Sequence, residues 1–367
     1  MNNEFTYKFY RHTTQAVSAM REAVLSAKSS IYWEIYTFID DEFGQSFVDA
    51  LCDKAQQGLE VKMIVDAVGS FDMSRNSIHR LRLAGVDLVF YNSLSPRHSL
   101  STWMSRLWYR NHRKVLIIDK DIVFLGGVNV AKIYSQWDDL HVRLSGRPVN
   151  ILLWSFATSY IHGGGDRKKV EHLLNLGIKN DIKEVRKRLK FILHSPIKFG
   201  DSSPKKFFLK SLETTKKKFN LMTPYFVPDK KFFNLISAAK ERGAEVNLFL
   251  PGKTDYNFTD WIVSFYARLA HKSGANIFLS PKMNHGKAMT RDKEIGFVGS
   301  ANLTPRSFFY NEEAGVLFEE KAMVEELDKI FEDLQKNSFQ LSPEIISPLF
   351  LKTKIKSWFG KHMGGWI

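Results

Sequence analysis

The sequence predicts an α/β protein made of two similar halves. A polar motif occurs twice, because residues 111–129 read NHRKVLIIDKDIVFLGGVN and residues 284–302 read NHGKAMTRDKEIGFVGSAN. Each residue of the second stretch lies 173 positions after its counterpart in the first (285 − 112). In each half, a strand, a helix and a second strand precede the motif, and units of this kind in series indicate an α/β architecture. The 367 residues suffice for two domains or for one large pseudo-symmetric unit.

The first half begins with a strand–helix–strand unit at residues 29–66, SSIYWEIYTFIDDEFGQSFVDALCDKAQQGLEVKMIVD. Gly58 marks the end of its helix, and the β-rich run LEVKMIVD forms the next strand. Cys52, the single cysteine, falls in this helix, where we expect a small core residue, and no intrachain disulfide can form. Residues 218–251 of the second half repeat the order, with Gly243 after the helix.

The first half carries an insertion before its copy of the motif. Val61 and Val246, at corresponding strand positions, are 185 residues apart (246 − 61), so the first half has 12 more residues there (185 − 173). They fall around residues 93–111, where tryptophan, tyrosine and methionine alternate with arginine. This composition suits contact with membrane headgroups or a phosphate ester, and equally a lid that packs on the core.

Composition shifts predict how the chain is divided. Glycine, serine and proline with scattered charge characterise residues 161–206, which we expect to connect an N-terminal half, 1–160, to a C-terminal half, 207–340. The apolar run at residues 149–161 is too short to span a membrane and predicts a buried helix. With no signal-peptide pattern in the sequence, we expect a cytoplasmic protein that is soluble or peripheral to the membrane.

The repeated polar residues predict a chemical site. HRKVLII, DKD and IVFL read as a β-hairpin, and alternation along its first strand puts His112 and Lys114 on one face. Asp119 in the turn has the wrong parity for that face, so we expect it to hold the hairpin or to balance charge. The glycines at 126 and 127 allow close approach of the backbone to a substrate, and Asn129 offers amide donors.

Both stretches resemble the H-x-K-x(4)-D…G-[GS]-x-N pattern of the phospholipase D superfamily, and the chain is similar to its two-copy, cardiolipin-synthase-like members. The likeness extends over about residues 25–315 and includes EIYTFIDDEFG, GLEVKMIVD, WDDLHVRLSG, TPYFVP and GSANLTPRSFFYNEE. It implies two similar α/β/α halves whose motifs meet in one site at the interface. It also implies a covalent phosphohistidine intermediate. Because the sequence has no H-E-x-x-H motif or carboxylate cluster of metal-ligand spacing, we expect no metal, and we expect no other cofactor.

Cleavage of a phosphodiester needs one neutral histidine to attack phosphorus and one protonated histidine to supply the leaving alkoxide. By the usual order in the family, His112 is the nucleophile and His285 the general acid, although the sequence equally permits the reverse. The lysines and asparagines of both copies can stabilise the phosphoryl oxygens. The full set of candidate catalytic residues is His112, Lys114, Asp119, Asn129, Asp139, His285, Lys287, Asp292, Asn302 and Glu313.

Asp139 and Glu313 are candidates to orient the histidine rings. Asp139 lies 27 residues after His112 (139 − 112) and Glu313 lies 28 after His285 (313 − 285). Their neighbours Asp138 and Glu312 are rivals for the same role.

The substrate is predicted from charge and composition. The 53 basic and 39 acidic residues give a net charge of +14, which suits an anionic membrane or nucleic acid. The C-terminal residues 341–367 read as a basic amphipathic tail that can lie on anionic lipid or dock on its own domain. We therefore expect a phosphatidyltransferase of the cardiolipin synthase type, peripheral on the cytoplasmic face of the membrane. The alternatives are a phospholipase D hydrolase and a metal-independent nuclease.

Overall fold

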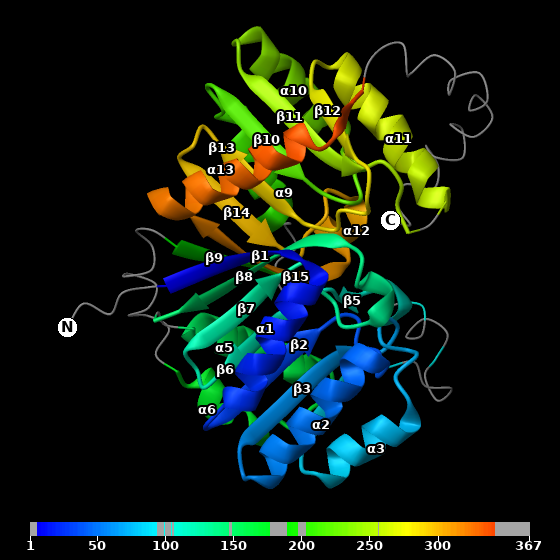
Figure 1. The fold of residues 1–367 in the computed structure, drawn as a ribbon, viewed down its shortest axis with the longest axis vertical. Helices are drawn as coiled ribbons and strands as arrows, with labels where there is room; N and C mark the ends of the chain where they lie inside the picture. Colours follow the sequence, from blue (N-terminus) through cyan, green and yellow to red (C-terminus); the bar gives the residue numbers. More distant parts are fainter. Residues whose placement is uncertain are drawn as a thin grey trace.

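The computed structural model describes residues 6–93, 99, 104, 106–146, 149–176, 189–196, 203–255 and 257–341. Two mixed β-sheets, one from each half of the sequence, lie next to each other with helices around them (Figure 1). The predicted α/β architecture with two similar halves is confirmed.

Within the described residues, the first sheet has seven strands in the order β1-β8-β7-β6-β2-β3-β4. The strands β2, β3 and β4 are parallel, whereas β6, β7 and β8 run antiparallel to their neighbours. Their bounds are β1 Thr6–His12, β2 Ser30–Ile35, β3 Glu60–Asp66, β4 Asp87–Tyr91, β6 Val115–Ile118, β7 Ile122–Gly126 and β8 Asp138–Ser145. The helices of this half are α1 Thr13–Ser26, α2 Glu42–Gln56, α3 Arg75–Leu83, α5 Asn150–His162 and α6 Glu171–Leu174, with 3₁₀ turns η1 Lys132–Tyr134 and η2 Arg167–Lys169.

The second sheet repeats this arrangement, in the order β16-β12-β11-β10-β13-β14-β15-β5, and β9 pairs with β15. Its strands are β5 Arg110–Asn111, β9 Leu189–His194, β10 Lys218–Met222, β11 Glu245–Pro251, β12 Asn276–Ser280, β13 Ala288–Arg291, β14 Ile295–Gly299, β15 Asn311–Phe318 and β16 Phe339–Gln340. Its helices are α9 Ser203–Glu213, α10 Lys230–Glu241, α11 Asn257–Lys272, α12 Pro305–Phe309 and α13 Lys321–Lys336. In both halves the predicted hairpin is present, as β6–β7 and as β13–β14.

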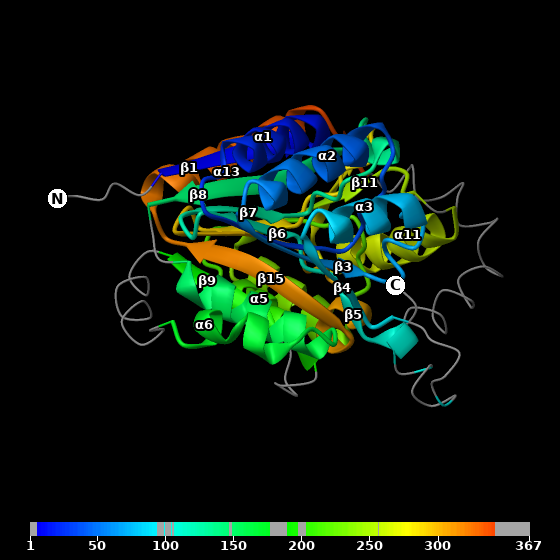
Figure 2. The ribbon, with the colours of Figure 1, turned by 90° about the horizontal axis from the view of Figure 1, so that it is seen from below.

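Helices cover both faces of the first sheet. One face packs on α1, α2 and α3, and the other carries α5 and α6 (Figure 2). The predicted buried helix at residues 149–161 corresponds to α5. Cys52 is buried in α2, as its position in the helix predicts.

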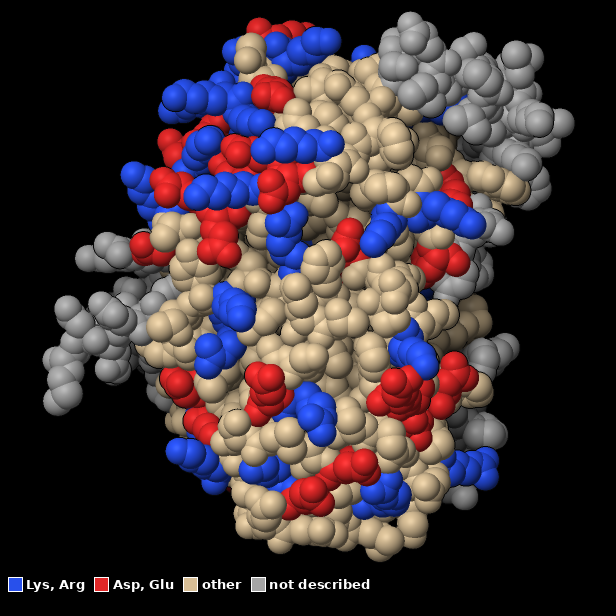
Figure 3. Space-filling view, in the orientation of Figure 1, with Lys and Arg blue, Asp and Glu red and all other residues tan. Residues whose placement is uncertain are grey.

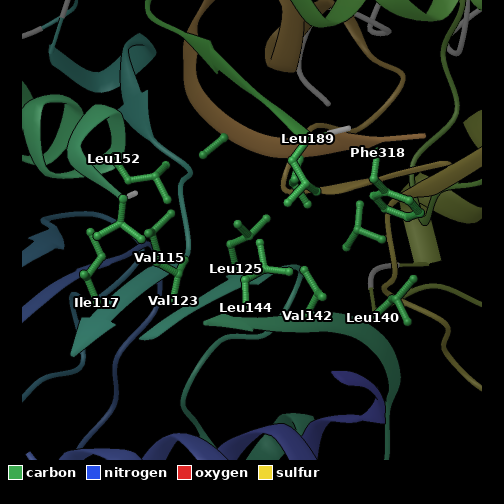
Figure 4. Close-up of a cluster of buried hydrophobic side chains, with 14 of the residues drawn as sticks. Val115, Ile117, Val123, Leu125, Leu140, Val142, Leu144, Leu152, Leu189 and Phe318 are labelled. Carbon is green, nitrogen blue, oxygen red and sulfur yellow. The ribbon is translucent and has the colours of Figure 1, made fainter. Parts of the chain in front are cut away.

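The core between the halves is one continuous apolar cluster. It joins Val115, Leu125 and Val142 of the first sheet to Val316 and Phe318 of the second (Figure 4). Because burial of apolar area stabilises by about 25 cal/mol per Å², this shared cluster holds the two sheets together as one unit.

Matching aspartates begin matching helices in the two halves. Asp41 accepts hydrogen bonds from the backbone N–H groups of Phe43 and Gly44 at the start of α2, at 3.0 and 3.4 Å. Asp229 accepts one from Phe232 at 3.1 Å at the start of α10. Capping of this kind is worth about 1 kcal/mol per helix and fixes where each helix leaves its strand.

Short strands also cross between the halves. β5 belongs to the first half of the sequence but pairs with β15, and β9, from the predicted connector, pairs with β15 as well.

The domain boundaries given above stay a prediction. Residues 342–367 of the predicted tail and much of the aromatic insertion lie outside the described residues. In the described part of the insertion, the rings of Trp108 and Tyr109 contact Tyr310, at 5.6 and 5.8 Å between centroids.

Candidate active site

The two histidine–lysine pairs lie at equivalent places in the two sheets. His112 and Lys114 immediately precede β6, and His285 and Lys287 immediately precede β13. All four side chains are buried, with at most 8% of any residue exposed. The edge of each sheet where the parallel strands end therefore presents one pair toward the other half.

Backbone hydrogen bonds across the interface bring these edges together. The N–H of His112 donates to the carbonyl oxygen of Glu312 at 3.0 Å, and the N–H of His285 donates to that of Asp138 at 2.7 Å. In both cases the acceptor is the residue just before a predicted orienting carboxylate. The same contact is thus made twice, once in each direction, as an approximate two-fold relation requires.

Each histidine ring is oriented by a carboxylate from the opposite half. Nδ1 of His112 lies 3.1 Å from both carboxylate oxygens of Glu313, and Nδ1 of His285 lies 2.8 Å from Oδ2 of Asp139. Spacing along the sequence relates Asp139 to His112 and Glu313 to His285. The pairs are crossed instead, because β8 and β15 approach the opposite sheet through the backbone contacts described above.

The rival carboxylates make other contacts. Asp138 is partly exposed and lies 2.7 Å from Nδ1 of His12, and Glu312 is buried beside Arg113 at 3.3 Å. Neither side chain has a bond to His112 or His285 among the described residues.

The two lysines are not equivalent. Nζ of Lys287 lies 2.8 Å from Nε2 of His285 and also donates to its carbonyl oxygen at 2.5 Å. Nζ of Lys114 donates to the carbonyl oxygen of His112 at 2.8 Å and lies 5.1 Å from the centre of the Tyr36 ring. Within the described residues, no donor is bonded to Nε2 of His112.

Both predicted asparagines are buried, but their side-chain oxygens differ in their hydrogen-bond partners. Oδ1 of Asn129 accepts from the N–H of Thr37 at 3.2 Å, which directs its NH₂ group away from that backbone. Oδ1 of Asn302 is buried and has no hydrogen-bond partner among the described residues, while its own N–H donates to Ser307 at 3.1 Å.

The small residues of the motif leave room for a carboxylate. A Cβ added to Gly127 would lie 2.0 Å from Oδ1 of Asp139, so the backbone here approaches the orienting carboxylate rather than only a substrate. The second half has Ser300 at this position, and its hydroxyl donates to Glu313. The carboxylate of Glu313 therefore has a hydroxyl donor where Asp139 has a glycine.

Burial dominates the protonation of the histidines. It lowers the pKa of His112 to about 4, although Glu313 acts in the opposite direction. It lowers the pKa of His285 to about 4 as well, with a further contribution from Lys287. Burial alone would raise the pKa of Glu313, but His112 and Lys114 lower it to about 2. At neutral pH each pair therefore consists of a neutral imidazole that donates Nδ1–H to an ionised carboxylate.

The lysines are affected by the same burial. Burial lowers the pKa of Lys287 to about 8, and burial together with the charge of Lys287 lowers that of Lys114. At neutral pH the Lys287 ammonium is therefore protonated and hydrogen-bonded to His285, and its lowered pKa makes it a stronger acid than an exposed lysine.

The aspartates of the motif are not brought to the histidines. Asp119 and Asp292 lie in the hairpin turns, at the far ends of β6 and β13. Asp119 accepts from the backbone N–H groups of residues 28–30, and Asp292 accepts from those of residues 216–218. These bonds lower the pKa of both carboxyl groups, although partial burial acts in the opposite direction. Both carboxylates thus anchor a hairpin, as parity predicts for Asp119, and neither has a bond to His112 or His285 among the described residues.

Aromatic rings that the motif does not contain surround the histidines. Tyr36 lies 4.9 Å from His112, and Trp137 and Tyr225 lie 5.4 and 6.5 Å from His285, between ring centroids. All three belong to stretches that resemble the family, EIYTF, WDDLH and TPYFVP, which was the signal available in the sequence.

Two further features concern metals and membranes. Among the described residues, no group of three or more His, Cys, Asp or Glu side chains is arranged to hold a metal ion. Within the same residues, no helix has both the length and the apolar composition needed to cross a bilayer.

Comparison with known proteins identifies relatives over most of the chain. The family model described as "Cardiolipin synthase, PLD-like domain" matches residues 20–153 and 208–335. A cardiolipin synthase of Clostridium perfringens is 30% identical over 86% of this chain and 67% of its own length. One of Listeria monocytogenes is 31% identical over 90% of this chain and 69% of its own length. This chain thus spans about two thirds of the length of these relatives.

Solved structures share the fold. A phosphatidylserine synthase of Haemophilus influenzae matches 98% of this chain and 95% of its own, with a TM-score of 0.71 and 14% identity. A polyphosphate kinase of Porphyromonas gingivalis matches 93% of this chain and 49% of its own, with a TM-score of 0.60 and 15% identity.

Proposed function

The chain belongs to the cardiolipin synthase, PLD-like domain family, and on that premise we propose that it is a phosphatidyltransferase of the cardiolipin synthase type. The observation that carries the proposal is the crossed pairing of each histidine with a carboxylate of the other half. Each histidine depends on both halves for its orientation, so the two motifs act as one site on one phosphodiester.

In the first step, His112 attacks phosphorus. Its Nδ1–H is held by Glu313, which leaves the lone pair of Nε2 to form the P–N bond. The P–O bond to the leaving alcohol breaks, and the alkoxide takes a proton from His285. The neutral ring that results accepts a hydrogen bond from Lys287 at Nε2 and serves as the base in the second step.

In the second step, an acceptor alcohol gives its proton to His285 and attacks the phosphohistidine. The P–N bond breaks and His112 is regenerated. When the alcohol is a second phosphatidylglycerol, the phosphatidyl group is transferred to it and the product is cardiolipin. When water takes the place of the alcohol, the product is phosphatidic acid. We infer that the buried side chains of Lys114, Lys287, Asn129 and Asn302 stabilise the phosphoryl oxygens. The anionic substrate also favours the protonated form of His285, which burial disfavours in the empty site.

Exposed apolar side chains support a substrate in a lipid surface. Phe71 follows β3 and is 83% exposed, and Ile133 follows β7 and is 72% exposed. In the second half, exposed Trp261 lies near the start of α11 after β11, and exposed Phe309 lies in α12 after β14. These segments all leave the sheet edges that carry the histidines. Apolar groups around the mouth of a site are suited to insertion among lipid headgroups.

The charge on the face seen in Figure 3 supports lipid over nucleic acid as the substrate. On the face seen in Figure 3, basic side chains over α10 and α13 alternate with acidic ones. A protein that follows a nucleic acid backbone presents a continuous positive track instead. We propose that the protein works peripherally on the cytoplasmic face of an anionic membrane.

Incubation of the purified protein with labelled phosphatidylglycerol, with and without added ethanol, tests the function. Transferase activity yields cardiolipin and glycerol, and in ethanol it yields phosphatidylethanol. Accumulation of phosphatidic acid alone would favour the hydrolase, and cleavage of single-stranded DNA without any lipid product would favour the nuclease. His112→Ala is the inactive control.

Vesicle co-sedimentation tests the lipid-facing surface separately. The double variant Phe71→Ser and Ile133→Ser is expected to bind phosphatidylglycerol vesicles more weakly than the unchanged protein. Leu83→Ser is the matched control, because Leu83 is 73% exposed at the opposite end of α3. Equal loss in both variants would contradict an apolar rim around the site.

A further inference from the structure

The two copies of the motif differ at their central residue. The first reads His112-Arg113-Lys114, whereas the second has Gly286 between its histidine and lysine. The adjacent strands differ in the same way, because Glu34 pairs with the residue after Lys114, and Met222 pairs with the residue after Lys287. One half therefore carries a buried charged pair where the other carries a methionine and a glycine.

The second half is closely packed at this point. A Cβ added to Gly286 would lie 2.7 Å from the terminal carbon of Met222. Arg113, in contrast, is 4% exposed, and its side chain is buried among polar groups next to the site. The difference is thus built into the packing of both halves.

The Arg113 guanidinium donates hydrogen bonds to three elements, β15, β9 and α5. Nε donates to the carbonyl oxygen of Glu313 at 3.2 Å, and Nη2 donates to that of His194 in β9 at 2.9 Å. Nη1 donates to Ser155 and Ser159 of α5 at 2.9 and 2.7 Å.

Two buried carboxylates also lie beside the guanidinium of Arg113. Nη1 of Arg113 lies 3.3 Å from Glu312 and 3.5 Å from Glu34. Ser159 and Ser195 also donate to Glu312, at 2.8 and 3.0 Å. The hydrogen bonds of Glu312 are therefore made from several sides, and its position on β15 is fixed.

These contacts act on the residue that orients His112. The side chain of Glu313 bonds to Nδ1 of His112, while its backbone oxygen bonds to Arg113. Glu313 is thus held through its side chain by His112 and through its backbone by Arg113. Asp139, which orients His285, is preceded by the partly exposed Asp138 and has no such support from Gly286.

We propose that Arg113 is a positioning residue that fixes Glu313 against His112 and so breaks the two-fold symmetry of the site in favour of attack by His112. This inference rests on the proposed function. A site with two equivalent histidines has no preferred nucleophile, and a rigid His112–Glu313 pair supplies the preference because a well-aligned nucleophile reacts faster.

Other charged and titratable groups face these two residues. Around His112 they are Glu313, Lys114, Lys287 and Tyr36, and around Arg113 they are Glu34, Glu312, Tyr91, His162 and His194. None of them is altered in Arg113→Lys, whereas the double variant below also replaces Glu34.

The test is a variant that makes the two halves alike. Arg113→Gly combined with Glu34→Met reproduces the pair found in the second half. With a p-nitrophenyl phosphodiester, we expect the single-turnover rate constant for phosphohistidine formation to fall about ten- to hundredfold, with KM within about twofold. A rate constant is not lowered by a misfolded fraction, so a purely structural role would leave it unchanged. We also expect peptide mapping to find the adduct on both His112 and His285, rather than on His112 alone.

Two further variants keep the test decisive. Arg113→Lys retains the charge but cannot reach all these partners at once, so a smaller fall in the same direction is expected. Lys62→Met removes another buried cation, paired with Asp87 at 3.3 Å outside the site, and is expected to lower thermal stability without changing the rate constant or the labelled residue.

Unchanged rate constants and labelling in both arginine variants would overturn the inference. Absence of any phosphohistidine in the unchanged protein would instead contradict the proposed function.

Discussion

The crossed pairing of histidines and carboxylates makes a distinct prediction for each carboxylate. Asp139→Asn removes the charge that holds Nδ1–H of His285, at 2.8 Å, and leaves the shape of the side chain nearly unchanged. Because His285 protonates the leaving alkoxide, this variant is expected to impair leaving-group departure. Glu313→Gln makes the same change at His112 and is expected to impair attack on phosphorus.

The expected magnitude follows from the bond that is lost. A hydrogen bond to a charged group contributes about 1.5–3 kcal/mol, so its loss in the transition state lowers the rate about 10- to 150-fold. For Asp139→Asn this loss applies to a phosphodiester whose leaving group is glycerol. With p-nitrophenol as the leaving group, departure needs no proton, and the loss is expected to shrink to about twofold.

The assay compares the single-turnover rate constant of phosphohistidine formation for the two leaving groups in each variant, because the second step needs His285 with either substrate. Glu313→Gln is expected to slow both substrates alike, since both require the nucleophile. Asp138→Asn is the matched control: its carboxylate pairs with His12 outside the site, and its backbone oxygen still accepts from His285. If Asp139→Asn slowed both substrates equally, or if Glu313→Gln spared the nitrophenyl substrate, the crossed assignment of roles would be refuted.

Four other expectations concern pH, metals and packing. Burial lowers the pKa of Lys287 to about 8, so the ammonium is lost as pH rises and kcat/KM is expected to fall about tenfold per pH unit above that value; Lys287→Met should abolish this limb of the profile. Activity is expected to persist in excess EDTA, because lysine and asparagine side chains stabilise the phosphoryl oxygens, and loss on chelation with recovery in Mg²⁺ would contradict this. Gly127→Ala would place a Cβ 2.0 Å from Oδ1 of Asp139. The carboxylate would have to move by about 1 Å, so kcat is expected to fall at least tenfold with little change in KM. Arg110→Met would leave Asp66 as an unpaired charge at a fully buried position, with an expected loss of about 3–5 kcal/mol in the free energy of unfolding, measured by urea denaturation.

Local pattern was sufficient to predict much of the fold. The hairpins, the helix over residues 149–161 and the strand–helix–strand units each depend on periodicity and turn residues within a few positions of one another. The parity of Asp119 already suggested that its carboxylate serves the hairpin, and its bonds to residues 28–30 have that form. The repeat likewise identified the histidines and lysines that lie together.

Contacts between the sheets could not be predicted in this way. The pairing of Glu313 with His112 spans 201 residues and depends on β15 reaching the other half, which no spacing within one half encodes. Arg113 was missed for a different reason. A comparison of the two copies draws attention to positions that match, and Arg113 matters where they differ, since Gly286 stands at its counterpart. The supporting serines, Ser155 and Ser159, lie on a helix whose pattern indicated only burial.

Identification of the covalently modified residue tests the central claim, that two halves form one site with one nucleophile, most directly. The protein is mixed with a p-nitrophenyl phosphodiester, quenched within a single turnover, and its peptides are mapped by mass spectrometry under conditions that preserve phosphohistidine. We expect one adduct per chain, on His112, which is absent in His112→Ala and persists in His285→Ala. Adducts on both histidines of the unchanged protein, or an adduct that forms in His112→Ala, would contradict it.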